Sequence, residues 1–356
     1  MNESRQEQLN RIVIKGFKSI KECDLELKNI NVLIGANGAG KSNFISVFDL
    51  LDYVLSNDLQ YYASKKGADT IFYNGIKATK SIELETHYKE GRYSCRLELS
   101  EINTIIDIGD VRRTSNFIVR ESDSDFFRLP SEFYKKHPWS LYHFNDTGSS
   151  ALLKMSNSIS NNVTLLPDAR NLSAFLFRLQ NSDKDNYKDS YKRILKAIQR
   201  VAPYFMDFVL LPEDSNNENI ILRWQEKGHK DVLRASQLSD GTLRFICLAT
   251  LLLQPGELQP STIIIDEPEL GLHPYAMTIV AELVKKAANK KQVILATQSA
   301  EFLDHFEAED VIVVDRTENG SEFKRLNEEK LAAWLEDDYS LGELWNKNLF
   351  GGRVAR

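Results

Sequence analysis

The chain has 356 residues, of which 42% are hydrophobic and 27% are charged, and its formal net charge is -6. This composition is that of a folded globular protein and excludes disordered and collagen-like chains. The acidic balance also excludes a uniformly basic nucleic-acid binder, although a local basic patch can still hold a phosphate backbone.

Hydrophobic runs and cysteines indicate where the protein acts. The longest largely apolar run, residues 245–253, is well short of the roughly 20 residues that cross a bilayer. Cys23, Cys95 and Cys247 are far apart and lack the paired spacing of a disulfide framework or a zinc knuckle. We therefore expect a cytoplasmic protein with reduced cysteines and no membrane segment.

The N-terminal part predicts a strand, loop and helix unit. Apolar and polar residues alternate over residues 11–34, with breaks at Gly16 and Asn31, which predicts strands. A glycine-rich stretch follows. Apolar residues then recur at helical spacing, so a helix is expected to begin near Lys41.

The middle of the chain predicts a side sheet and an insert. Several period-two segments between residues 81 and 120 are typical of antiparallel hairpins with one buried face. From 121 to 235 the pattern loosens and predicts an inserted α/β subdomain. Its expected helices are 171–180 and 190–201, and its expected strands are 208–211 and 219–224.

The last third returns to strands that alternate with helices. The near-continuous apolar segments TIIID, QVILAT and DVIVVD are typical of strands in a parallel sheet that is covered on both faces. The sequence thus predicts an α/β fold in three parts. Residues 1–120 and 236–356 form two lobes of one core with a mixed sheet, and residues 121–235 form the insert.

Residues 35–42, GANGAGKS, form a complete phosphate-binding loop between an apolar strand and a helix. The backbone must curl so that successive N–H groups face phosphate oxygens, which explains the small residues. Lys41 reaches the β- and γ-phosphates, and the Ser42 hydroxyl suits Mg²⁺. The expected ATP-binding residues of the loop are Asn37, Gly38, Ala39, Gly40, Lys41 and Ser42.

A buried strand, TIIID, ends in two adjacent acids followed by Pro268. Apolar residues have no reason to give way to charge there unless the charge is used. Asp266 is expected to hold Mg²⁺ together with Ser42. Glu267 is expected to polarise the attacking water as a general base.

Residues 238–244, LSDGTLR, resemble the signature motif of ABC ATPases, usually written LSGGQ, with Asp240 and Thr242 as departures. The resemblance implies that Ser239 and the backbone of Gly241 bind the γ-phosphate of a nucleotide held by the opposite subunit. A plain Ser/Asp helix cap is the alternative. The order of the motifs along the chain favours the ABC interpretation.

Residues 266–274 and 296–299 resemble motifs of the OLD, RecF and SMC-related branch of ABC ATPases. The resemblance is strongest to compact predicted AAA-family ATPases without a Toprim domain, which open with a segment like GFKSIKE and close with one like YSLGELWNKNLFGGR. It implies that residues 269–272 communicate across a dimer. It also implies that Gln298, where transporters usually carry His, senses the γ-phosphate without a titrating imidazole.

Other polar groups in the sequence are candidates for further sites. The glutamine loop of ABC ATPases cannot be placed, and Gln60 fits by position only. Glu121, Asp123 and Asp125 are interpreted as a solvated acidic turn and not as a nuclease site. His273 is interpreted as a helix cap or a dimer contact. The sequence assigns packing and turn roles to His137, His143 and Asn145.

The resemblance implies a homodimer or a higher even-numbered oligomer that binds ATP and Mg²⁺ and hydrolyses ATP slowly, with Glu267, Lys41 and Gln298 as catalytic residues. The leading hypothesis is the ATPase of a bacterial anti-phage defence system that controls a separately encoded nuclease or toxin. The alternatives are a RecF-like DNA-repair ATPase, which binds DNA directly, and a non-catalytic ATP-dependent scaffold.

Overall fold

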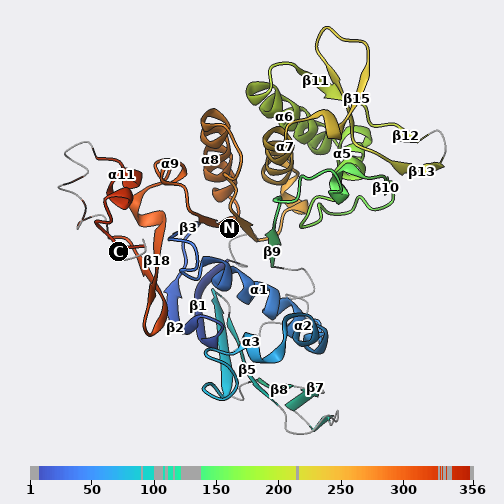
Figure 1. The fold of residues 1–356 in the computed structure, drawn as a ribbon. Coiled ribbons are helices and arrows are strands. Elements are labelled where there is room, and N and C mark those ends of the chain that lie inside the picture. The colour runs from blue at the N-terminus through green and yellow to red at the C-terminus, as the bar shows by residue number, and fades with distance from the viewer. Residues whose placement is uncertain are drawn as a thin grey trace. The chain divides into compact units, whose positions relative to one another are not determined.

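The computed structural model describes residues 8–89, 91–99, 107–108, 111–114, 117–121, 138–213, 216–327, 329, 331, 334 and 339–352. The chain forms two compact units (Figure 1). The first unit holds the residues up to Leu141 and those from Ile294 on, and the second holds Tyr142–Val293. The chain passes between the units within strands β9 (Trp139–Tyr142) and β17 (Gln292–Thr297).

An antiparallel sheet of seven strands makes up much of the first unit, in the order β2-β1-β4-β5-β8-β7-β6. Side chains along β4 alternate between buried and half-buried positions, as expected for a strand with one face on a core. The predicted hairpins are therefore confirmed, and they share one sheet with the N-terminal strands. The strands are β1 (Leu9–Phe17), β2 (Ile20–Glu26), β4 (Ser81–Tyr88), β5 (Gly91–Leu99), β6 (Asp107–Ile108), β7 (Val111–Thr114) and β8 (Phe117–Glu121).

The first unit also carries a mixed parallel and antiparallel arrangement. Strand β18 (Val311–Thr317) pairs in parallel with β3 (Ile30–Ile34) and antiparallel with β19 (Gly320–Arg325). The predicted helix begins at Lys41 as α1 (Lys41–Leu55), and Phe44 and Phe48 are among its fully buried residues. The shorter helices are α2 (Leu59–Lys66), α3 (Ala68–Ile71), α9 (Ala300–Leu303), α11 (Leu341–Asn346) and the 3₁₀ turn η5 (Ala308–Asp310).

The second unit combines four main helices with small sheets. Helix α7 packs against α6 and α8, and α6 also packs against α5. The helices are α5 (Leu172–Asn181), α6 (Asp185–Val201), α7 (Asp240–Leu253), α8 (Pro274–Ala288), and the 3₁₀ turns η2 (Leu152–Lys154), η3 (Ala235–Gln237) and η4 (Gly256–Leu258). The strands are β10 (Asn157–Ser158), β11 (Phe205–Phe208), β12 (Pro212–Glu213), β13 (Asn216–Ile220), β14 (Arg223–Glu226), β15 (Val232–Arg234) and β16 (Thr262–Asp266).

Element bounds in the second unit differ from the sequence prediction. The strand expected at 208–211 is β11, which ends at Phe208, and the strand expected at 219–224 is divided between β13 and β14. An aromatic cluster explains the change, because the ring of Phe205 lies 4.9 Å from that of Phe208 and 5.3 Å from that of Trp224. Such packing overrides local strand propensity. The division of the sequence at residues 120 and 235 stays a prediction.

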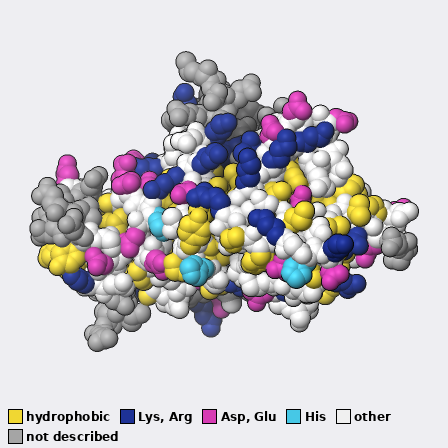
Figure 2. All heavy atoms as spheres, turned by 90° about the horizontal axis from the view of Figure 1, so that it is seen from above, with side chains coloured by type: hydrophobic (Ala, Val, Ile, Leu, Met, Phe, Trp, Pro, Cys, Tyr) yellow, Lys and Arg dark blue, Asp and Glu magenta, His cyan; other side chains and the backbone are white. Residues whose placement is uncertain are grey.

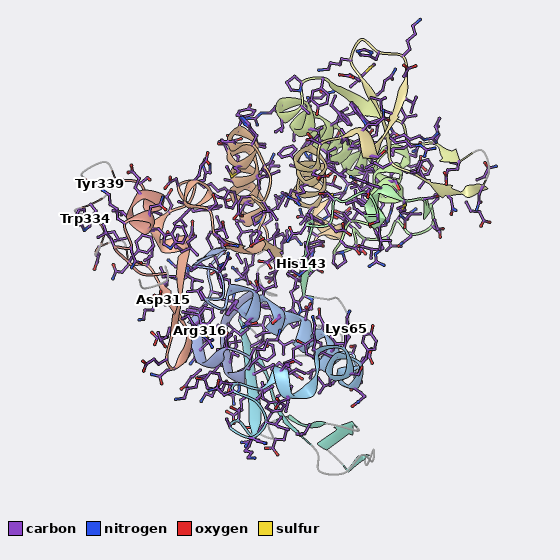
Figure 3. The ribbon with its side chains drawn as sticks, in the orientation of Figure 1. Lys65, His143, Asp315, Arg316, Trp334 and Tyr339 are labelled. Carbon is purple, nitrogen blue, oxygen red and sulfur yellow. The ribbon has the colours of Figure 1, made fainter. Side chains whose placement is uncertain are left out.

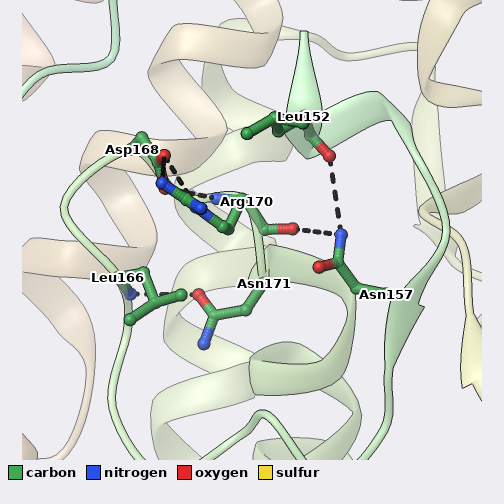
Figure 4. A network of polar contacts seen from close by, with 6 residues as sticks. All are labelled: Leu152, Asn157, Leu166, Asp168, Arg170 and Asn171. Carbon is green, nitrogen blue, oxygen red and sulfur yellow. Dashed lines mark hydrogen bonds and ion pairs between the residues drawn. The ribbon is translucent and has the colours of Figure 1, made fainter.

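A buried asparagine organises the loop before α5 (Figure 4). Asn171 is fully buried, and its Oδ1 accepts a 3.0 Å hydrogen bond from the N–H of Leu166. Its Nδ2 donates to the carbonyls of Asn161 and Thr164 at 2.9 and 2.8 Å. A buried amide with its donors and acceptor satisfied can hold an irregular loop in one conformation.

No helix in the described ranges is long and apolar enough to cross a membrane. On the face drawn in Figure 2, hydrophobic side chains lie in small groups between charged ones, and lysine and arginine side chains gather toward its upper part. Scattered apolar groups of this kind are normal on a protein surface.

Candidate nucleotide-binding site

The phosphate-binding loop lies in the first unit between the end of β3 and the start of α1. Gly40, at the N-cap of α1, has φ 122°. A Cβ at this position would overlap the hydroxyl of Ser321, so the residue must be glycine on both conformational and steric grounds. The loop therefore opens directly onto a helix N-terminus, which favours an anion.

Lys41 is buried and folds back over its own loop. Its Nζ donates to the carbonyl oxygens of Gly35 at 2.6 Å and Ala36 at 3.0 Å. These contacts hold the ammonium group inside the curl of the loop. The contact of Lys41 with the β- and γ-phosphates stays a prediction.

Two residues from the C-terminal part of the sequence, Gly352 and Asp315, hold the phosphate-binding loop by hydrogen bonds. The N–H of Ala36 donates to the carbonyl of Gly352 at 2.6 Å, and the N–H of Gly352 donates to Oδ1 of Asp315 at 2.5 Å. Figure 3 marks Asp315 on β18. Sequence patterning does not mark Asp315 as a site residue, because a single acid near a strand end carries no motif.

Lys18 packs beside helix α1 with backbone φ 47°, in the left-handed region. Its Nζ donates to the hydroxyl of Ser46 at 2.7 Å, and its N–H donates to the carbonyl of Ile71 at 2.8 Å. Burial, together with the charge of Lys66, lowers the pKa of the Lys18 ammonium to about 8. The segment GFKSI thus anchors α1, a role that local sequence patterning did not reveal.

Gln298 follows the end of β17 in the first unit. The next residue, Ser299, caps α9: its hydroxyl accepts from the N–H of Phe302 at 3.0 Å. Its own N–H donates to the hydroxyl of Thr297 at 3.0 Å. Gln298 is therefore held at a defined strand-to-helix junction, and its sensing role stays a prediction.

The predicted acidic pair lies in the second unit at the end of β16. Ile263, Ile264 and Ile265 are buried, and Asp266 is half-buried at the end of the strand. Glu267 has φ 50°, a left-handed conformation that costs a residue with a Cβ roughly 1–2 kcal/mol. Such strain collects at functional sites, because the surroundings must hold it in place.

His143 lies next to Asp266 within the second unit. Its Nδ1 is 4.0 Å from Oδ2 of Asp266, and 45% of its side chain is exposed. Figure 3 labels His143, which directly follows β9. The sequence pattern alone predicts a packing or turn role for His143. The structure adds a contact with the predicted metal carboxylate, which no sequence signal indicated because 123 residues separate the two positions in the printed numbering.

Ser239 is the N-cap of α7, as the helix-cap interpretation predicted. Its Oγ accepts from the N–H of Thr242 at 3.1 Å and lies 2.8 Å from the Thr242 hydroxyl. Asp240 and Thr242, the two residues that depart from the usual signature motif, each contact another side chain. Asp240 forms a 3.5 Å ion pair with Lys154, and the Thr242 hydroxyl lies 3.3 Å from that of Tyr204.

The remaining candidate residues lie at helix or strand ends or outside the described residues. Nδ1 of His273 accepts from the N–H of Tyr275 at 3.3 Å, which confirms a cap on α8. Gln60 lies in the first turn of α2. Glu121 ends β8. Asp123, Asp125 and His137 lie outside the described residues, and within those ranges no group of three or more His, Cys, Asp or Glu could hold a metal.

Residues 30–304 match the family model described as "AAA domain, putative AbiEii toxin, Type IV TA system". The chain belongs to this family. An OLD nuclease from Thermus scotoductus is 24% identical over 383 residues, covering 97% of this chain and 68% of that protein. The chain is thus an ABC-type P-loop ATPase of the OLD- and SMC-related branch, as predicted.

Solved Smc head domains share the fold. A crystal structure of an Smc head bound to the C-winged helix domain of ScpA has a TM-score of 0.61 and 17% identity, covering 91% of this chain and 99% of that chain. An Smc head derived from Pyrococcus furiosus has a TM-score of 0.58 and 17% identity, covering 93% and 99%. One derived from Pyrococcus yayanosii has a TM-score of 0.56 and 13% identity, with coverage of 93% and 99%. The predicted fold class is therefore confirmed.

Proposed function

We propose that this family member binds and hydrolyses ATP with Mg²⁺ as a homodimer or a higher even-numbered oligomer. The observation that carries the proposal is the loop of residues 35–42, in which buried Lys41 is folded into the curl at the open N-terminus of α1. A fixed ammonium group and a helix N-terminus together form a site for a polyphosphate.

Oxygen donors fit the metal that accompanies the nucleotide. The hydroxyl of Ser42 and the carboxylate of Asp266 are hard ligands of the kind that Mg²⁺ prefers, and the ion would neutralise charge on the phosphates. Glu267 orients and polarises the attacking water. Gln298 senses the γ-phosphate by hydrogen bonding, and its amide does not titrate, which agrees with slow turnover.

Ser239 and Gly241 complete the site from the opposite subunit in this proposal. Ser239 caps α7, so the N-terminus of this helix is ordered and carries the positive end of the helix dipole. Its hydroxyl accepts a hydrogen bond from the N–H of Thr242, and in the proposed site it donates its own proton to a phosphate oxygen. ATP binding then closes the dimer, and hydrolysis opens it.

Subunit mixing tests the shared site. Lys41→Ala and Ser239→Ala should each be inactive alone, because each damages both sites of a homodimer. A mixed dimer retains one intact site, so an equimolar mixture should recover about a quarter of the wild-type ATPase rate. An independent site in each subunit would instead give no recovery above the sum of the two variants. Lys65→Ala, at an exposed position of α2, is the matched control.

We further propose that the ATPase controls a separately encoded nuclease or toxin in anti-phage defence. The resemblance to an OLD nuclease over 97% of this chain and membership of a family described as "putative AbiEii toxin, Type IV TA system" support this role. Glu267→Gln should bind ATP without hydrolysing it and trap the closed state. Purified from its native host with ATP, it should carry a nuclease or toxin subunit, which mass spectrometry would identify.

Two other outcomes distinguish the alternatives. A trapped dimer that retains only DNA would favour a RecF-like repair ATPase, and its DNA affinity should fall steeply with salt concentration. A Glu267→Gln strain with full biological function would favour a non-catalytic scaffold, since only ATP binding would then be needed.

A further inference from the structure

Arg244 joins helix α7 to two separate loops of the second unit. Its Nη1 donates to the carbonyl of Leu270 at 2.7 Å, and its Nη2 donates to the carbonyl of Asn145 at 2.9 Å. The planar guanidinium offers donors in a fixed fork, which suits two acceptors on different segments. One side chain therefore ties the signature segment (residues 238–244) to the β16 loop (residues 267–272) and to the β9 loop (residues 143–145).

The signature segment and the β16 loop also meet without a side chain between them. A Cβ on Gly241 would overlap the carbonyl of Gly271, and a Cβ on Gly271 would crowd the Arg244 guanidinium. Gly271 has φ 71°, a conformation that favours glycine. This close approach lets the Arg244 hydrogen bonds hold both backbones in register.

Both clamped loops lead directly to the predicted chemical groups. The N–H of Leu270 donates to the carbonyl of strained Glu267 at 3.2 Å, so the clamp on Leu270 is one hydrogen bond from the predicted base. On the other side, Asn145 lies two residues after His143, whose Nδ1 is 4.0 Å from Asp266. Movement of α7 would therefore be transmitted to both Asp266 and Glu267.

We propose that Arg244 is a positioning residue that makes the signature segment, the β16 loop and the β9 loop move as one face toward the nucleotide of the opposite subunit. The inference rests on the proposed shared ATP site. Arg244 acts through its hydrogen bonds to the backbone carbonyls of Leu270 and Asn145 and does not touch the nucleotide itself.

A purely stabilising role fits the geometry less well. The Nε of Arg244 is buried and has no hydrogen-bond partner among the described residues. Burying a donor without a partner costs stability. An apolar side chain of similar length would avoid that cost, whereas only the fork reaches both carbonyls.

Dimerisation separates this role from nucleotide binding. In a Glu267→Gln parent, Arg244→Met should weaken ATP-driven dimerisation about tenfold or more in sedimentation experiments, because the two loops are no longer held to the signature segment and must be ordered when the subunits associate. Affinity for a methylanthraniloyl ATP analogue, measured on dilute subunits, should stay within about twofold of the parent. In an otherwise unchanged chain, kcat should fall together with dimerisation.

Two further variants complete the test. Arg244→Lys keeps the charge but lacks the fork, so it should be intermediate, and it replaces the Met variant if that variant fails to fold in circular dichroism. Arg200→Met removes an exposed arginine that pairs with Glu282 at 3.3 Å in the same unit, and it should match the parent. Arg244 variants that dimerise like the parent would overturn the inference. A parent that does not dimerise with ATP would overturn the proposed shared site as well.

Discussion

The hydroxyl of Ser321 donates a 2.6 Å hydrogen bond to the carbonyl of Ala39, from β19 to the phosphate-binding loop. Nδ2 of Asn43 donates to the hydroxyl of Ser19 at 2.7 Å, and this hydroxyl lies 2.7 Å from that of Ser321. A series of hydrogen bonds thus connects Asn43 on α1, through Ser19 and Ser321, to the phosphate-binding loop. Because carbonyl and N–H point in opposite directions across a trans peptide, this bond aims the N–H of Gly40 away from Ser321.

Ser321→Ala should loosen this peptide and weaken ATP binding about three- to tenfold, the effect of losing one neutral hydrogen bond at a buried carbonyl. The rate constant kcat should change little, since the catalytic acids are untouched. Titration with a fluorescent ATP analogue and steady-state kinetics would measure both. Ser64→Ala, whose hydroxyl donates only to a carbonyl of its own helix at 2.8 Å, is the control. Equal affinities for the two variants would contradict the prediction.

Lys41→Ala should abolish detectable ATP binding while leaving the protein folded. The substitution removes the only charge that the loop itself carries, along with the hydrogen bonds to Gly35 and Ala36. We expect at least about a hundredfold loss of affinity, because contacts with charged phosphates are strong. Isothermal calorimetry would measure it. Lys65→Ala, at an exposed position that Figure 3 marks, should bind ATP normally. Retained ATP binding by Lys41→Ala would place the nucleotide elsewhere.

Asp52 on α1 makes stability depend on pH. Burial, with a smaller contribution from Asp49, raises the pKa of its carboxyl to about 7. An unfolded carboxyl has a pKa of about 3.9, so the folded protein binds more protons between pH 4 and 7. The stability that this proton contributes is fully present below about pH 4 and is lost as pH rises to about 7, a total of about 4 kcal/mol.

Asp52→Asn keeps a neutral side chain at every pH and should remove this decline. Its free energy of unfolding minus that of the wild type should be about 2–3 kcal/mol larger at pH 8 than at pH 5, meaning that the variant gains relative stability as the pH rises. Urea denaturation at the two pH values would measure the difference. Asp58→Asn, at an exposed position, should show no comparable change. A difference that is the same at both pH values would show that Asp52 ionises normally.

Asn171→Ala should destabilise the second unit by about 2–4 kcal/mol. The change removes three hydrogen bonds and leaves the N–H of Leu166 and the carbonyls of Asn161 and Thr164 without this partner. Thermal unfolding would measure the loss. Asn157, in the same network of Figure 4, is half-buried and bonds chiefly to the carbonyl of Arg170 at 2.6 Å. Asn157→Ala should therefore cost about 1 kcal/mol or less, and equal losses would contradict the assignment.

The sequence predicted the parts of this protein that local chemistry encodes. The start of α1 at Lys41, the buried strand that ends at Asp266 and the Ser239 cap each follow from residues close together in the chain. A phosphate loop needs small residues in a row, and a buried strand needs an apolar run. Both requirements produce a pattern in the sequence itself, and this pattern predicted the family and the fold class.

Tertiary structure alone decided which distant residues support those motifs. Ser321 reaches Ala39 across 282 positions, and Arg244 reaches Asn145 across 99. A single serine or arginine has no periodicity and no fixed spacing to its partner, so nothing in the sequence distinguishes it from its exposed counterparts. Such contacts exist only after folding, because strand pairing and helix packing bring remote backbone carbonyls within hydrogen-bond distance of one side chain.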